Sequence, residues 1–209
     1  MSSLRMVVVS SPTFKDGEPK TVCKLLENGL QGFHLRKPDH STKQIAKFLD
    51  KIPNELMKRI IIHRKPELLK DYNVGGYHHT SKELLQKTSG IRSRSLHKLS
   101  ELDQCERELD YVFFGPIFES ISKVGHKPKT RLPEVRKRLE KYKTVSQRPL
   151  VYALGGIRKS KISYLWDSGF DGVALLGAVW GKPDPLSACK EFSKAMEIQS
   201  LILKNRNNF

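Results

Sequence analysis

The chain has 209 residues, of which 38% are hydrophobic and 29% are charged. This composition is ordinary for a globular protein, and the length fits one domain with its own core. The apolar runs fall short of the roughly 18 residues that a membrane-spanning helix needs, and residues 1–11 lack a secretory pattern. The sequence therefore predicts a cytoplasmic protein with no membrane partner. The three cysteines are far apart and form no CxxC pair, which is typical of reduced thiols.

The formal net charge of +16 is the unusual bulk property. It suits either contact with nucleic acid or the capture of small anionic substrates. The basic residues are spread along the chain, and no zinc-finger spacing, recognition-helix signature or RNA-binding aromatic motif accompanies them. We therefore expect small anionic ligands and no specific nucleic-acid partner.

Short apolar runs alternate with amphipathic stretches along the chain. Because the runs are too short for helices and are rich in β-branched or aromatic residues, each is predicted as a strand. In chain order, the predicted strands are residues 7–9, 32–36, 59–63, 76–78, 91–95, 111–114, 150–154 and 172–176. The predicted helices are residues 19–28, 42–50, 67–72, 80–87, 99–108, 132–142, 159–168 and 186–203.

Strands alternating with helices indicate a parallel sheet covered by helices. The repetition of eight units favours a single (β/α)8 TIM barrel over an open doubly wound sheet. We expect this barrel to occupy residues 1–203, with residues 204–209 as a frayed tail and no second domain.

Barrels of this kind bind phosphate in the loops after the seventh and eighth strands. In this chain those loops contain Gly155 and Gly156, and Leu176 and Gly177. Their backbone N–H groups, close to a helix start, are predicted to hold a phosphoryl group. The alternative is that the glycines serve only to make tight turns.

Several motifs are similar to those of one enzyme superfamily. The segments DYVFFGPIFESISK (residues 110–123), PLVYALGGI (149–157) and GFDGVALLGAV (169–179) resemble the last three strand motifs of the thiamine phosphate synthase superfamily, which also contains the thiazole tautomerases. The earlier segments FHLRK (33–37), GGYHH (75–79) and SLHKLSEL (95–102) agree more loosely and in the same order. The resemblance implies a barrel enzyme of thiamine biosynthesis that binds a phosphorylated thiazole. It also implies phosphate contacts from the loop after the sixth strand, at Ser120, Ser122 and Lys123.

The synthases of this superfamily join a pyrimidine methyl diphosphate to a thiazole phosphate with the help of Mg²⁺. They usually carry Asn-Asp after the third strand, Asp after the fourth and Gln-x-Arg-x-Lys after the second. The corresponding positions of this chain hold His63 and Arg64, then Glu83, then His34, Arg36 and Pro38. A guanidinium thus stands where a metal carboxylate is usual, and it would oppose a metal ion there.

Three residues are candidates for binding the metal ion or the diphosphate. Glu83 is the candidate Mg²⁺ ligand, although residues 80–83 also read as a capping box for the helix that follows. Arg64 and Lys37 would hold the diphosphate directly, through bidentate and point-charge contacts.

The tautomerases need no metal, but they do need an acid/base with a pKa near neutrality, for which histidine is the usual choice. His97 stands at the position where such members present a histidine, with Ser95 as a nearby substrate contact. His34 matches the tautomerase form and is the second catalytic candidate. Arg36 would contact the substrate carboxylate or phosphate. The alternatives are a loop hydrogen bond for His97 and an interior salt bridge for Arg36.

The preferred hypothesis is a thiazole tautomerase-like isomerase that needs no cofactor. The runner-up is a Mg²⁺-dependent thiamine phosphate synthase, and the third is a non-catalytic barrel that binds thiazole phosphate. The expected partners are thus a phosphorylated thiazole and, for the synthase, a pyrimidine diphosphate. A homodimer stays open, because barrels often pair but nothing in the sequence marks an interface. The sequence contains no close spacing of metal ligands, so we expect no structural zinc site.

Overall fold

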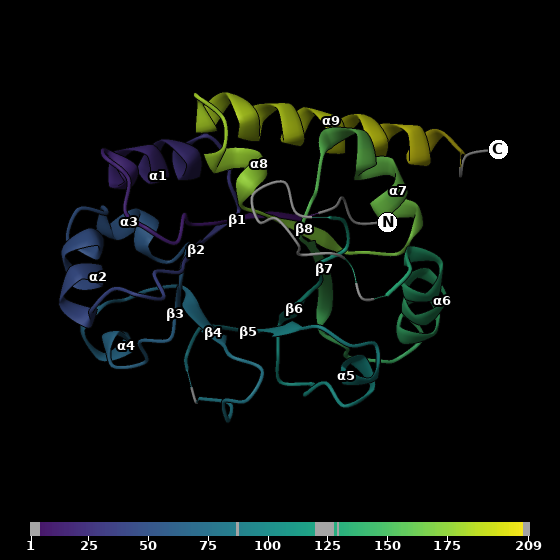
Figure 1. The fold of residues 1–209 in the computed structure, drawn as a ribbon, viewed down its shortest axis with the longest axis horizontal. Coiled ribbons are helices and arrows are strands. Elements are labelled where there is room, and N and C mark those ends of the chain that lie inside the picture. Colours follow the sequence, from purple (N-terminus) through teal and green to yellow (C-terminus); the bar gives the residue numbers. More distant parts are fainter. Residues whose placement is uncertain (1–4, 87, 120–127, 129, 207–209) are drawn as a thin grey trace.

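The computed structural model describes residues 5–86, 88–119, 128 and 130–206. Parallel strands form a closed barrel in which each strand pairs with the next and β8 pairs with β1, as the alternation of strands and helices predicted (Figure 1). The strands are β1 (Arg5–Val9), β2 (Gly32–Leu35), β3 (Ile60–His63), β4 (Gly76–His79), β5 (Ile91–Leu96), β6 (Tyr111–Phe114), β7 (Leu150–Leu154) and β8 (Gly172–Leu175).

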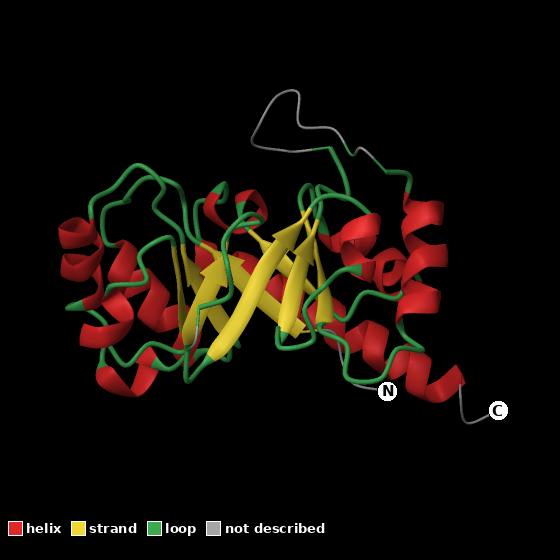
Figure 2. Ribbon diagram, turned by 90° about the horizontal axis from the view of Figure 1, so that it is seen from below, coloured by secondary structure: helices red, strands yellow, loops and turns green. Residues whose placement is uncertain are grey.

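Helices cover the outside of the barrel (Figure 2). They are α1 (Glu18–Glu27), α2 (Thr42–Leu49), α3 (Asn54–Met57), α4 (Leu68–Asp71), α5 (Ser100–Asp103), α6 (Leu132–Tyr142), the 3-10 helix η1 (Lys159–Lys161), α7 (Ile162–Asp167), α8 (Gly177–Trp180) and α9 (Pro185–Arg206). Local signals fix several helix starts, such as the capping box of Ser41 with Gln44 at α2 and a proline in the first turn of α1 and of α6. The long α9 packs against α1, α7 and α8 and so closes the outer layer.

The structure departs from the predicted elements at a few places. Residues 80–86 are not helical, although a helix was expected over 80–87; Leu84 is 86% exposed, so the segment buries no apolar face that would stabilise a short helix. The four-residue helices α3 and α8 were not predicted, because so few residues give no periodicity. Helix α9 continues to Arg206 and therefore includes residues 204–206, which we had expected to belong to the frayed tail.

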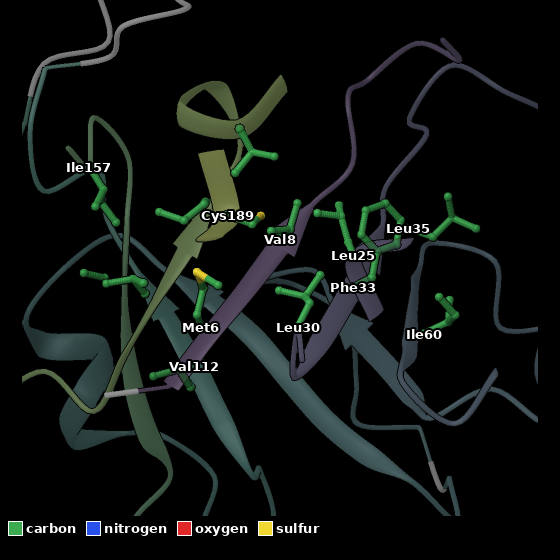
Figure 3. Close-up of a cluster of buried hydrophobic side chains, with 14 of the residues drawn as sticks. Met6, Val8, Leu25, Leu30, Phe33, Leu35, Ile60, Val112, Ile157 and Cys189 are labelled. Carbon is green, nitrogen blue, oxygen red and sulfur yellow. The ribbon is translucent and has the colours of Figure 1, made fainter. Parts of the chain in front are cut away.

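The apolar side chains of the strands form two separate cores. Side chains on the outer face of the barrel, such as Val8 and Phe33, pack against helix residues such as Leu25 of α1 (Figure 3). Alternate positions point inward instead, and Val7, Val9, Tyr111, Phe113, Tyr152 and Ala174 fill part of the barrel interior. This separation follows from the two-residue repeat of a strand. Among the described helices, none is both long and apolar enough to cross a bilayer.

Candidate functional site

A pocket of about 620 Å³ lies at the carboxyl ends of the strands. Each strand of the barrel contributes to its lining at or just after its last residue. From β1 to β8 these residues are Ser11, Arg36, Arg64, Thr80, His97, Gly115, Gly155 and Leu176. The volume is within the range of small-molecule sites, and this is the end of the barrel where such folds bind ligands.

The loops after β7 and β8 bring bare backbone to one side of the pocket. Gly155 and Gly156 both have left-handed φ values, 96° and 63°. A Cβ at Gly156 would lie 2.4 Å from the backbone oxygen of Glu119, so glycine is required for packing as well as for the turn. At the start of α8, Val179 and Trp180 donate to the Leu176 oxygen, whereas the N–H groups of Gly177 and Ala178 have no backbone acceptor among the described residues. The amides of Gly177 and Ala178 can therefore bind an anion, the role predicted for Gly177; for Gly155, Gly156 and Leu176 that role stays a prediction.

Cationic residues also line the pocket. Arg36 and Arg64 follow β2 and β3, and Lys15 comes from the β1–α1 loop and donates from Nζ to the Trp180 oxygen at 3.0 Å. Within the described chain, the guanidinium groups of Arg36 and Arg64 make no hydrogen bond or ion pair. Burial, and then the charge of Arg64, lower the pKa of Arg36. Among the described residues, therefore, none forms the interior salt bridge considered for Arg36, and this side of the pocket suits an anionic ligand.

Magnesium does not fit this lining. Mg²⁺ prefers carboxylate oxygens, but no aspartate or glutamate is present among the described residues that line the pocket. Glu83, the predicted ligand, lies outside the lining and accepts hydrogen bonds from the Tyr77 hydroxyl (2.8 Å) and the Thr80 N–H (3.1 Å). These bonds hold its carboxylate within the segment after β4.

His97 lies at the pocket, exposed, directly after β5. Its Nδ1 is 2.7 Å from the carbonyl oxygen of Gly115, which can only accept, so Nδ1 carries a proton. The neutral ring therefore leaves Nε2 as an unprotonated nitrogen that can take a proton from a ligand. Ser95 also lines the pocket, and its hydroxyl lies 2.9 Å from Nε2 of His78.

His34 is not in the pocket. It points into the barrel interior, is fully buried, and hydrogen-bonds Nε2 of His63 through Nδ1 (3.0 Å) and the Tyr111 hydroxyl through Nε2 (2.6 Å). Burial lowers its pKa to about 3. The prediction that His34 touches substrate is thus not supported by its position. Its neighbours His63 and His78 line the pocket instead.

The three rings together raise the question of a metal site that sequence spacing did not reveal. One nitrogen from each of His34, His63 and His78 lies within 4.8 Å of the others, and burial keeps the pKa of each ring below its ordinary value. However, the rings of His63 and His78 are stacked at 4.2 Å with 21° between their planes. Lone pairs of nearly parallel rings do not converge on one ion, and His34 already bonds to His63. His78 in turn hydrogen-bonds the hydroxyls of Ser93 (2.8 Å) and Ser95 (2.9 Å), so both of its ring nitrogens already have partners.

Lys37 was predicted to hold diphosphate, but it points away from the pocket. Its ammonium bonds both carboxylate oxygens of Glu18 (2.6 and 2.8 Å) and the carbonyl oxygens of Ser11 and Thr13, and neither side chain of the pair is exposed. Arg36 lines the pocket and Lys37 does not, because consecutive side chains leave the backbone in different directions. The buried pair ties the end of β2 to the start of α1. The predicted contacts Ser120, Ser122 and Lys123 lie outside the described residues.

Sequence reasoning missed Lys15 and gave no role to His63. Both follow or end a strand, so a systematic reading of polar residues at strand ends would have found them. Trp180 of α8 was also missed, since a four-residue helix leaves no pattern to read. The cysteines are unpaired, and burial raises the pKa of Cys189 to about 12, which is unsuited to a nucleophile.

The sequence and the fold of this chain are similar to those of known proteins. The profile described as thiamine monophosphate synthase matches residues 5–179. The chain belongs to the thiamine monophosphate synthase family. A thiamine-phosphate synthase of Clostridium tetani is 27% identical over 185 residues, which cover 81% of this chain and 86% of the relative. One from Synechococcus sp. (strain WH7803) is 24% identical over 205 residues; the match covers 91% of this chain but 56% of that longer relative.

A solved structure of the same family agrees with the fold. The thiamine phosphate pyrophosphorylase of Bacteroides thetaiotaomicron superposes on this chain with a TM-score of 0.77 at 28% identity, covering 94% of this chain and 98% of that one. The family resemblance inferred from residues 110–123, 149–157 and 169–179 is therefore confirmed.

Proposed function

We propose that this protein is a thiamine-phosphate synthase, which joins a pyrimidine methyl diphosphate to a thiazole phosphate and releases diphosphate. The relatives that it resembles carry this name. The observation that carries the proposal is the presence of two anion-binding regions in one pocket. Backbone amides after β7 and β8 form one region, and Arg36 and Arg64 after β2 and β3 form the other. In a closed barrel of β1 to β8, strands β3 and β7 lie on opposite sides.

Two separate regions suit two phosphorylated substrates better than one. In this proposal the amides of Gly156 and Gly177 bind the thiazole phosphate, which carries the smaller charge. The two guanidinium groups bind the diphosphate, because planar guanidinium groups form paired hydrogen bonds to phosphate oxygens. Holding both substrates in one pocket brings the reacting atoms together, and positive charge beside the diphosphate stabilises it as a leaving group.

A tautomerase remains the second candidate, and one observation favours it. The Nδ1–H of His97 is fixed on the Gly115 oxygen, so Nε2 is available as a base at the pocket. Proton transfer within a thiazole ring would need such a base and no second anion-binding region. Our first expectation from the sequence was this reaction. The charge distribution of the pocket and the names of the relatives instead favour the synthase.

The test supplies the full chain with both precursors and follows diphosphate release and thiamine phosphate formation. We expect both products to appear together, and an Arg36→Ala variant to lose at least about tenfold in kcat/KM, because a charge-assisted contact to the leaving group is removed. Arg107→Ala is the matched control, since this exposed residue precedes β6 at the other end of the barrel.

A second assay separates the competing functions. The isomerisation of thiazole carboxylate phosphate, abolished by His97→Gln, with no coupling of the two precursors would refute the synthase proposal and select the tautomerase. Saturable binding of thiazole phosphate without turnover in either assay would select the non-catalytic barrel.

A further inference from the structure

We propose that Arg36 and Arg64 bind a diphosphate group directly, in place of a divalent metal ion. This inference rests on the proposed function for its choice of ligand, but it concerns binding and not turnover. Its ligand class is an organic or inorganic diphosphate. It predicts that diphosphate binds even when a chelator has removed divalent metal ions.

The first argument is the charge of the lining. Arg36, Arg64 and Lys15 contribute cations, and the described lining has no carboxylate to balance them. Glu18 and Glu83 bond to other groups. Glu18 is paired with Lys37, and Glu83 accepts from Tyr77 and Thr80. Asp39 influences Arg36 through its charge, but it is exposed and does not line the pocket.

The second argument is the state of the two guanidinium groups. They have no hydrogen-bond or ion-pair partner in the described chain, and they are close enough for the charge of Arg64 to act on Arg36. Arg36 is half-buried and Arg64 is exposed, so their like charges repel each other with partial screening by water. A diphosphate removes this repulsion and accepts hydrogen bonds from both groups, so binding is favoured twice by the same contact.

The third argument is the backbone of Arg64, whose φ of 60° is left-handed and uncommon for arginine. Strained residues of this kind persist where the surrounding fold imposes them, and they are frequent at ligand sites. This conformation comes directly after β3, and the side chain lines the pocket. The guanidinium of Arg64 would repel a divalent ion placed beside it. The same position therefore does not hold both the guanidinium and a metal ion.

The experiment measures the binding of inorganic diphosphate by calorimetry in EDTA at fixed ionic strength. The wild-type chain should bind it saturably. Arg64→Ala should weaken binding by about tenfold or more, the loss expected for a charge-assisted contact. Arg107→Ala removes the same charge at the opposite end of the barrel and should change the dissociation constant by less than about twofold, since exposed charges at that distance are screened. Circular dichroism and thermal unfolding verify that each variant is folded.

A second variant is designed to replace direct binding by arginine with binding through Mg²⁺. Aspartate tolerates the left-handed conformation and offers a carboxylate to Mg²⁺. Arg64→Asp should therefore bind diphosphate poorly in EDTA and recover affinity when Mg²⁺ is added, whereas the wild-type chain should gain nothing from the metal.

Four results would overturn the inference: no binding of diphosphate by the wild-type chain in EDTA, a gain in its affinity on adding Mg²⁺, unchanged affinity in Arg64→Ala, or wild-type affinity of Arg64→Asp in EDTA. None of these depends on turnover. A chain that binds diphosphate in EDTA but fails to couple the two precursors would sink the synthase proposal alone.

Discussion

The buried histidine cluster makes the stability of this protein sensitive to acid, and His34 is the residue through which this is best measured. Its ring is fully buried, and burial lowers its pKa to about 3, against an ordinary value of about 6.5 in an unfolded chain. Between these two values, the unfolded chain binds a proton that the folded chain does not. The free energy of unfolding therefore falls as the pH falls below about 6.5.

The size of the effect follows from the two pKa values. Lowering the pH from 7.5 to 5 favours protonation of unfolded His34 by about 2 kcal/mol, because each pKa unit is worth about 1.4 kcal/mol. His63 and His78 have depressed pKa values as well, mainly through burial, and add to the total in the same direction. Acidic groups contribute to any wild-type curve, so only a comparison with a variant isolates the histidine.

The assay is urea unfolding of the wild-type chain and of His34→Gln at pH 7.5, 6 and 5. Glutamine keeps a hydrogen-bonding side chain but does not titrate. Between pH 7.5 and 5 the wild-type free energy of unfolding should fall by about 2 kcal/mol more than that of the variant. Parallel curves, with a difference below about 0.5 kcal/mol, would refute the view that His34 is held neutral in the barrel.

Two further changes test the packing around the site. In urea unfolding, Lys37→Met should destabilise the chain by about 3–5 kcal/mol, because it leaves the Glu18 carboxylate buried without its partner. Adding Glu18→Leu should recover much of that loss. A cost below about 1 kcal/mol for the single variant would contradict this. Gly156→Ala should destabilise the chain more than Gly29→Ala, although both glycines have positive φ. A new Cβ at Gly156 would lie 2.4 Å from the Glu119 oxygen, whereas a Cβ at Gly29 would have nothing within 4 Å. Equal losses would show that the loop after β6 moves aside freely.

Much of the fold could be predicted from sequence because the signals are local. Runs such as residues 60–62 and 111–114 are apolar over a strand's length, and eight such runs separated by helical segments leave few topologies other than a barrel. The position of the glycines after β7 and β8 at the pocket could be predicted as well, since the fold fixes which end of a strand carries the site. The family followed from contiguous motifs.

The roles of individual side chains were decided by contacts between residues far apart in the chain. Nothing near Lys37 in sequence indicates that Glu18 takes its charge, and His34, His63 and His78 meet only because three neighbouring strands set them side by side. Whether a side chain enters the pocket, the barrel interior or the helix layer depends on strand register and on the alternation of side chains along each strand. A shift of one residue reverses that direction. The spacing of polar residues therefore located the site, and the closed barrel determined which of them line the pocket.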